Sequence, residues 1–254
     1  MFVILLVFIF GLFIGSFLNV LIYRLPRGLG FVKGRSFCPK CKKKISWYDN
    51  IPVFSFVFLR GKCRQCRSPI SLRYPIVELL TGCLFVLIIN QIGQIDLIKQ
   101  ILHLVLISGL IVIFFIDLEH RIIPDEIIFP VIFLFFLFSL ISNRQLLITN
   151  YLPSALGAFF FLFLIWAISR GRGMGFGDVK LAFLMGLCLG FPKIIIAFYI
   201  AFLTGALSGV ILILVKKAKF GQQIAFGPFL ALGTFTALIW GEKILETVQK
   251  SLLG

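Results

Sequence analysis

The sequence has 254 residues, of which 60% are hydrophobic and only 14% are charged, and its mean hydropathy is +1.07. These fractions exclude an ordinary soluble domain and indicate a protein that crosses a membrane several times. A formal net charge of +15 would suggest nucleic-acid binding in a soluble protein, but in a membrane protein the basic residues are first tested as markers of topology.

The first 23 residues carry no charge. A secretory signal needs a basic start, a shorter apolar core and a small-residue cleavage site, so we expect a retained spanning helix. Seven further runs approach the roughly 20 apolar residues that a spanning helix needs. The sequence thus predicts an all-α polytopic membrane protein with about eight transmembrane helices, at residues 2–23, 74–95, 98–117, 125–143, 151–169, 177–192, 194–215 and 223–241.

The loop at residues 24–73 is the only connection long enough to form a small domain. It holds two Cys-x-x-Cys pairs, Cys38 with Cys41 and Cys63 with Cys66. Each pair closes a tight turn that aims two sulfurs at one tetrahedral ion, which is typical of a structural zinc knuckle. Two disulfides or idle thiols are the alternatives, and a reducing cytoplasm disfavours disulfides.

The basic residues predict the orientation of the chain. With the N-terminus outside, 20 of the 25 Lys and Arg residues fall on the inside segments, which are 24–73, 118–124, 170–180 and 216–222. The positive-inside rule therefore predicts an outside N-terminus and a cytoplasmic loop 24–73. Membrane lipid headgroups explain the basic loop better than nucleic acid, so no nucleic-acid partner is expected. Arg24, at the end of the first span, is expected to anchor at the headgroups.

We divide the chain into a first transmembrane helix (1–23), a cytoplasmic zinc-binding loop domain (24–73) and a membrane bundle (74–254) that carries the most informative acids. A charge in a bilayer is costly, so acids at span ends mark candidate functional sites.

Asp117 ends the third span, and Glu119 and Asp125 follow it in a short inside turn. Asp178 opens the sixth span. Both places face the cytoplasm in the predicted topology, so helix bundling can bring Asp117 and Asp178 together.

A pair of close carboxyls is suited to hydrolysis, because the two groups cannot both ionise cheaply and one keeps a proton. The ionised group then takes a proton from an attacking water, and the neutral group donates one to the substrate. Gly175 and Gly177, just before Asp178, are expected to allow a sharp turn and close approach of a substrate chain. The alternative for Asp178 is a simple helix cap.

Six blocks along nearly the whole chain resemble the signatures of the type IV prepilin peptidases, leader peptidases of the GxGD membrane aspartyl protease class, in the family's order. They are GSFLNVLIYRLPRG (15–28), the paired Cys-x-x-Cys motifs, RYPIVELLTG (73–82), IDLEHRIIPD (116–125), GFGDVKL (175–181) and FGPFLALG (226–233).

The resemblance implies that Asp117 and Asp178 are the catalytic aspartates. It further implies cleavage of the basic leader of prepilins or pseudopilins at the cytoplasmic face of the bacterial inner membrane. Many members also methylate the new N-terminus with S-adenosylmethionine, and because the chain has no dinucleotide-type glycine fingerprint, that site has to come from the loop and the bundle.

Three other residues are left with open roles. Glu78 is a candidate to meet a cationic amine or sulfonium, or else a partner for Arg73 or another nearby base. Lys180 is expected either to pair with an acid or a substrate carboxylate, or to snorkel to the interface. Asp125, which follows Pro124, is expected to be less critical than the aspartate pair because it suits the first turn of a helix.

Two other classes of function compete with the peptidase. In a transporter, the acidic pair would relay protons or bind a cation, but no repeat between the two halves of the chain supports that class. In a non-enzymatic pilus assembly factor, the knuckle would dock partners and the aspartates would tolerate replacement by Asn.

Overall fold

The computed structural model describes residues 2–31, 34–92, 97–216 and 225–253, and within these ranges it contains helices and two isolated β-bridges but no strand. The α-helices are α1 (Phe2–Arg24), α2 (Phe54–Phe58), α3 (Arg73–Ile92), α4 (Leu97–His120), α5 (Asp125–Ser142), α6 (Arg144–Leu146), α7 (Leu152–Ile168), α8 (Phe176–Leu189), α9 (Lys193–Leu214) and α10 (Gly227–Leu253). Short 3-10 turns lie at Leu25–Arg27 and Trp47–Asn50, and a π turn at Leu147–Tyr151 joins α6 to α7. The predicted all-α fold is confirmed.

Each of the eight predicted apolar runs coincides with a helix, apart from residues 93–95 and 223–224, which lie outside the described ranges. Six helical stretches within those ranges are long and apolar enough to cross a membrane. They comprise α1, α3, α4, α5, the continuous stretch from α6 to α7, and α9. The short sixth run forms α8, whose 14 residues extend only about 21 Å, less than the ~30 Å of a hydrocarbon core.

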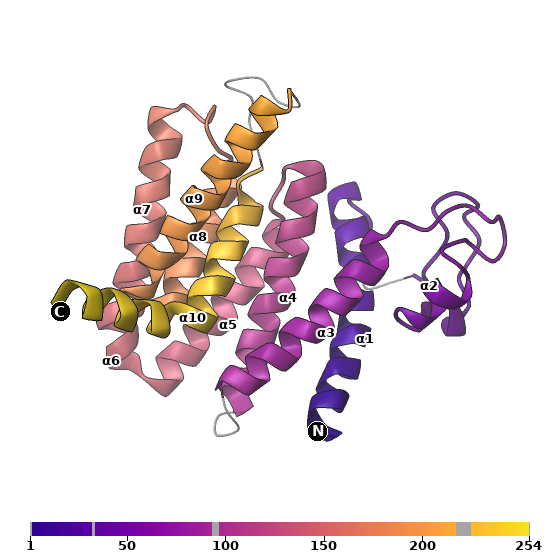
Figure 1. The fold of residues 1–254 in the computed structure, drawn as a ribbon, viewed down its shortest axis with the longest axis horizontal. Coiled ribbons are helices and arrows are strands. Elements are labelled where there is room, and N and C mark those ends of the chain that lie inside the picture. Colours follow the sequence, from indigo (N-terminus) through magenta and orange to yellow (C-terminus); the bar gives the residue numbers. More distant parts are fainter. Residues whose placement is uncertain (1, 32–33, 93–96, 217–224, 254) are drawn as a thin grey trace. The chain divides into compact units, whose positions relative to one another are not determined.

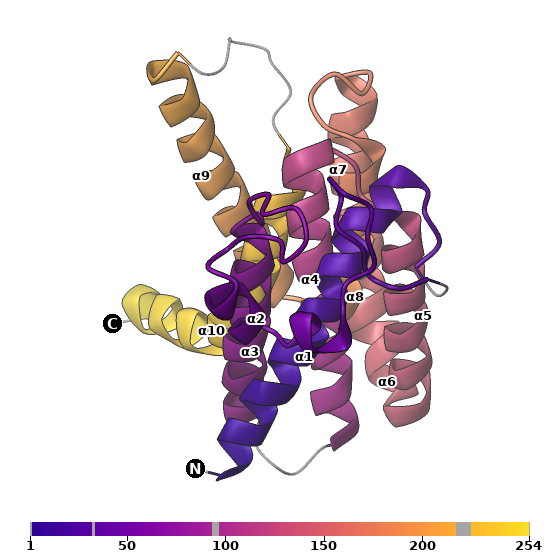
Figure 2. The same ribbon diagram turned by 90° about the vertical axis from the view of Figure 1, so that its right-hand side faces the viewer.

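The chain divides into two compact units, Met1–Val112 and Ile113–Gly254. The boundary between them lies within α4. In the first unit α1 and α3 run side by side (Figure 1 and Figure 2). A Cβ on Gly11 would lie 2.7 Å from the Cα of Gly82, and one on Gly15 would lie 2.7 Å from the Cα of Glu78. Two glycines four residues apart therefore let the backbones of α1 and α3 approach closely, as in membrane helix pairs.

Arg24 does not anchor at the headgroups, so that prediction is wrong. Its side chain is only 5% exposed and donates hydrogen bonds to the backbone carbonyls of Gly30 and Arg35, both at 3.0 Å, and of Gly34 at 3.4 Å. A buried guanidinium needs such partners because its charge has left water. Arg24 thus folds the beginning of the loop back onto the end of α1.

In the second unit α8 is the central helix, in contact with α5, α7, α9 and α10. Most of its side chains are buried, although it is the shortest of the eight helices that match the predicted apolar runs. A Cβ on Gly186 would lie 2.5 Å from the Cα of Ala155, so the backbones of α8 and α7 touch at this glycine. The helix begins with the exposed Phe176, and within its first turn Asp178 is buried.

Candidate active site and metal centre

Asp117 lies in the last turn of α4, with its side chain 5% exposed. The helix ends one turn later, where Arg121 takes a positive φ of 57° and donates its N–H to the Asp117 carbonyl. One carboxylate oxygen of Asp117, Oδ2, accepts the backbone N–H of Gly227 at 3.0 Å. Gly227 is the first residue of α10, so the positive end of that helix dipole faces the carboxylate.

Asp178 lies in the first turn of α8 and is also 5% exposed. Its Oδ2 accepts the N–H of Gly175 at 3.1 Å, while its own N–H donates to the Gly175 carbonyl at 3.2 Å. This reciprocal pair is a capping box, so helix capping accounts for one oxygen of Asp178. The other oxygen, Oδ1, is buried and has no hydrogen-bond partner among the described residues. Capping alone therefore does not explain this carboxyl group.

The structure brings Asp117 and Asp178 together within the second unit, close enough for the Asp117 charge to act on the Asp178 carboxyl. Both groups are buried, and each has one oxygen held by the N–H of a glycine at the start of a helix. Because a buried polar atom without a partner is unusual, the open Asp178 Oδ1 marks a place for a proton, a water or a substrate atom.

The other predicted supporting acids lie outside this pair. Asp125 is the first residue of α5 and forms an ion pair of 2.6 Å with Lys180 of α8, so Lys180 pairs with an acid of its own chain. Both side chains are partly exposed, and such a pair contributes only about 0.2–1 kcal/mol. Glu119 is exposed and lies 3.9 Å from His120.

The two glycines before Asp178 have different surroundings. Gly175 adopts φ −77° and ψ 154°, an extended conformation open to any residue, so the turn itself does not require glycine there. A Cβ on Gly177, in contrast, would lie 2.9 Å from the Cβ of Ile123. Gly177 is therefore required by packing within the protein.

Sequence reasoning did not single out Gly227 or Ile123. A glycine followed by Pro228 at the start of a helix could have indicated a helix N-terminus open to an anion, because proline favours the first turn. Ile123 carries no such signal, since one more isoleucine in an apolar chain is not distinctive.

The four loop cysteines converge in the first unit. The four sulfurs, those of Cys38, Cys41, Cys63 and Cys66, all lie within 4.8 Å of one another. The Cys38 and Cys66 sulfurs are 3.9 Å apart. Four sulfurs around one zinc at about 2.3 Å have comparable separations, so the donor set fits a tetrahedral zinc ion. All four cysteines are free thiols, so neither pair forms a disulfide.

The two halves of the knuckle share one backbone pattern. Cys38 donates its N–H to the Lys43 carbonyl and accepts the N–H of Lys42, and Cys63 makes the same two bonds with Ser68 and Arg67. Lys42 and Arg67 both take a positive φ, of 56° and 54°. A repeated left-handed turn after each Cys-x-x-Cys pair presents both sulfurs to the same point.

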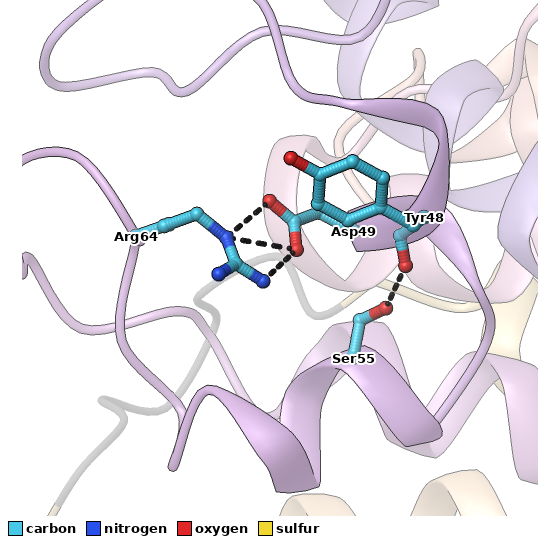
Figure 3. A network of polar contacts seen from close by, with 4 residues as sticks. All are labelled: Tyr48, Asp49, Ser55 and Arg64. Atoms are coloured by element: carbon cyan, nitrogen blue, oxygen red, sulfur yellow. Dashed lines mark hydrogen bonds and ion pairs between the residues drawn. The ribbon is translucent and has the colours of Figure 1, made fainter.

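Two features complete the knuckle. Hydrogen bonds from Ser68 lower the pKa of the Cys66 thiol to about 6, which favours the thiolate that a metal needs. Between the two cysteine pairs, Asp49 accepts hydrogen bonds from both Nε and Nη2 of Arg64, and the Ser55 hydroxyl donates to the Tyr48 carbonyl (Figure 3). Since Arg64 lies inside the second pair, this ion pair fastens the intervening segment to the metal site.

Glu78 lies in α3 and is buried against α1. Its carboxylate accepts the backbone N–H of Val53 at 2.8 Å and is hydrogen-bonded to the Ser16 side chain. Val53 has a positive φ of 60°, which a β-branched residue rarely adopts. Glu78 thus holds a strained point of the loop on α3 through partners that are both uncharged.

Comparison with known proteins finds two family models along the chain. The bacterial peptidase A24 N-terminal domain matches residues 9–92, and the type IV leader peptidase family matches residues 104–210. The first match covers α1, the knuckle and α3, and the second covers both aspartates.

Curated relatives match nearly the full chain. A protein of Aeromonas hydrophila is 35% identical, over 94% of this chain and 91% of its own, and one of Bacillus subtilis (strain 168) is 36% identical, over 97% and 98%. A protein of Pseudomonas aeruginosa is 32% identical, over 93% and 90%. All three are named prepilin leader peptidase/N-methyltransferase. No solved structure matches the chain.

Proposed function

The chain belongs to the type IV leader peptidase family, and on that premise we propose that it is a membrane aspartyl endopeptidase that cleaves the basic leader from type IV prepilins or pseudopilins. The family and its relatives support peptidase activity together with N-methylation. The acid mechanism and the residues that carry it are our proposal.

In the proposed reaction one carboxylate of the pair accepts a proton from water as the water oxygen attacks the scissile carbonyl. The other carboxyl donates its proton to the carbonyl oxygen. When the tetrahedral intermediate collapses, the first group passes the proton from water to the leaving nitrogen, and the second group takes its own proton back. The C–N bond breaks, which leaves a carboxylate on the leader and a free amine on the mature pilin. A pair that shares one proton begins with one group in each required state.

The observation that carries this proposal is the geometry of the pair. Asp117 and Asp178 are both buried, and glycine N–H groups orient one oxygen of each. The remaining Asp178 oxygen has no hydrogen-bond partner in the part of the chain that the structure describes. In an assembly factor, nothing requires a buried carboxyl oxygen to stay open beside a second acid. A transporter could use such an oxygen, and the family match and the curated relatives favour the peptidase over it.

The test is conversion of a prepilin substrate to its shorter form by purified protein. Asp117→Asn and Asp178→Asn keep the side-chain shape but remove the titratable oxygen, so each should abolish cleavage while the protein stays in the membrane. Asp125→Asn is the matched control, because it loses only a partly exposed ion pair, and it should slow the reaction without stopping it. Turnover by Asp178→Asn near that of the wild type would refute the acid mechanism.

For the methyl transfer, we propose that Glu78 helps to hold the cationic sulfonium of S-adenosylmethionine or the new amine. A buried carboxylate whose partners are Val53 and Ser16, both uncharged, favours a cation nearby. The cofactor supplies the methyl group when it is bound. The role of the protein is to bring the pilin amine and that methyl group together.

We propose that the cysteine cluster holds a structural zinc ion. Four thiolates fill the tetrahedral coordination sphere and leave no position for a reactive water. The ion would close the knuckle by joining its two halves, which have few buried apolar side chains of their own.

The helices and relatives support a multi-pass protein of the bacterial inner membrane. We further propose that the N-terminus lies outside and that residues 24–73 and the aspartate pair face the cytoplasm, where 20 of the 25 basic residues would then lie. Reporter fusions to the connections before Leu97 and after Ile168 should report opposite sides of the membrane. The same side for both would exclude this topology.

A further inference from the structure

The turn between α4 and α5 lies beside the aspartate pair but has no role in the proposed reaction. It contains Ile123, whose half-buried side chain reaches the first turn of α8. A Cβ placed on Gly177 would lie 2.9 Å from Ile123 Cβ, 3.2 Å from Cγ1 and 3.4 Å from Cδ1. The side chain of Ile123 therefore occupies the space that a side chain at residue 177 would need. Gly177 is next to Asp178.

The same side chain also reaches the first turn of α10. A Cβ placed on Gly227 would lie 3.2 Å from Ile123 Cδ1, as well as 2.7 Å from Asp117 Oδ2. Ile123 therefore touches two glycines on two helices, one beside Asp178 and the other bonded to Asp117.

The turn that carries Ile123 is tied on both sides. Before it, the backbone carbonyl of Asp117 accepts the N–H of Arg121 at the end of α4. After it, Asp125 forms its ion pair with Lys180, one turn from Gly177 on α8. Ile123 cannot move far without moving one of these contacts, so its position is set by the same helices that carry the acids.

We propose that Ile123 is a positioning residue of the acid pair. Its side chain acts as the spacer between the N-terminal turns of α8 and α10 and thereby sets the distance and orientation of the Asp117 and Asp178 carboxyls. This inference rests on the proposed aspartyl mechanism and adds a reason for glycine at residue 177, which is the room that Ile123 takes.

The test is a double-mutant cycle on prepilin cleavage, with kcat and KM measured separately. Gly177→Ala should lower kcat about 100-fold, because a shift of about 1 Å at a catalytic group costs that much, and should leave KM nearly unchanged. Ile123→Ala removes two of the three close atoms and should cost about 10-fold alone. In combination with Gly177→Ala it should recover part of the lost kcat, about 10-fold over Gly177→Ala alone, because the contacts with Cγ1 and Cδ1 are gone while the contact with Cβ at 2.9 Å remains.

Gly227→Ala is the comparison, because its closest contact is with Asp117 itself. Ile123→Ala should not rescue it. Gly157→Ala, on α7 of the same unit with nothing within 4 Å of the added Cβ, should keep full activity. If the kcat losses of Gly177→Ala and Ile123→Ala simply add in the double variant, the proposal is overturned.

A second pair of variants, both at Ile123, tests the proposal if Gly177→Ala does not accumulate in membranes. Ile123→Val should stay within about 3-fold of the wild-type kcat, and Ile123→Phe should fall at least 30-fold by about the same displacement. Equal activity of these two variants would also overturn the proposal. Asp117→Asn and Asp178→Asn are assayed alongside. If these two variants cleave prepilin, the acid mechanism is wrong. If they do not cleave and Ile123→Ala does not rescue Gly177→Ala, the acid mechanism stands and only the role of Ile123 as a spacer is wrong.

Discussion

Replacing one knuckle cysteine tests the zinc proposal quantitatively. Cys66→Ser removes one of four sulfurs that lie within 4.8 Å of one another and puts in its place a neutral hydroxyl, which is a poor zinc ligand. A structural zinc site binds with roughly 10–16 kcal/mol. One quarter of that is about 2.5–4 kcal/mol, so zinc affinity should fall by about 10²–10³-fold.

The wild-type protein should return about one zinc per chain by metal analysis, because all four sulfurs converge on a single point. After dialysis against a chelator, Cys66→Ser should have lost most of its zinc under conditions in which the wild type keeps it. Limited proteolysis should then cut within residues 34–72, since the proposed zinc ion is lost and the segment between the cysteine pairs keeps the Asp49–Arg64 ion pair and the bond from Val53 to Glu78. Prepilin cleavage should fall only in part.

Cys83→Ser is the matched control, because Cys83 is an exposed cysteine of α3 and is not part of the cluster. It should keep zinc, proteolytic resistance and activity. A full zinc content in chelator-treated Cys66→Ser, or no zinc in the wild type, would refute the reasoning.

Three further predictions concern both units. Glu78→Gln removes a charge but keeps an acceptor for the Val53 N–H, so mass spectrometry of the mature pilin should find normal cleavage with methylation reduced at least 10-fold. Arg24→Ala removes the charged donor of three backbone carbonyls, and each such hydrogen bond contributes about 1.5–3 kcal/mol, so the loop should become sensitive to protease. Arg27→Ala, at an exposed neighbour, should leave the loop resistant. Cleavage should have a bell-shaped pH profile, because one carboxyl has to be ionised and the other protonated. Asp125→Asn, which lies outside the pair, should lower the rate but keep the bell shape, and a profile without two limbs in the wild type would contradict the shared-proton mechanism.

Much of the architecture was predictable from the sequence. Apolar runs of about 20 residues indicate membrane helices, because backbone groups in lipid have to be satisfied within the segment. Each of the eight predicted runs overlaps a helix, and six helical stretches of the described residues are long and apolar enough to cross a membrane. The Cys-x-x-Cys spacing predicted the thiol cluster because a short turn leaves the sulfurs little freedom. The acids at span ends were informative for a similar reason, since a charge in an apolar chain is costly unless it has a function.

The sequence was less informative about how long charged side chains and small residues are used. Arg24 was predicted at the headgroups, yet it is buried with three carbonyl partners that follow it in the chain. Lys180 was left between snorkelling and pairing, and its partner Asp125 comes from another helix. A flexible side chain can reach several partners, and only the fold decides among them.

By itself, the sequence determined a helical membrane protein, a thiol cluster and two acids at helix ends, because hydrophobic length, motif spacing and the cost of buried charge are local properties. Only the tertiary structure decided that Gly227 donates to Asp117 across 110 residues and that Ile123 fills the space beside Gly177. These contacts depend on which helix ends meet within the second unit. Packing at distances of 3–4 Å is set by the whole bundle, and no local pattern along the chain encodes it.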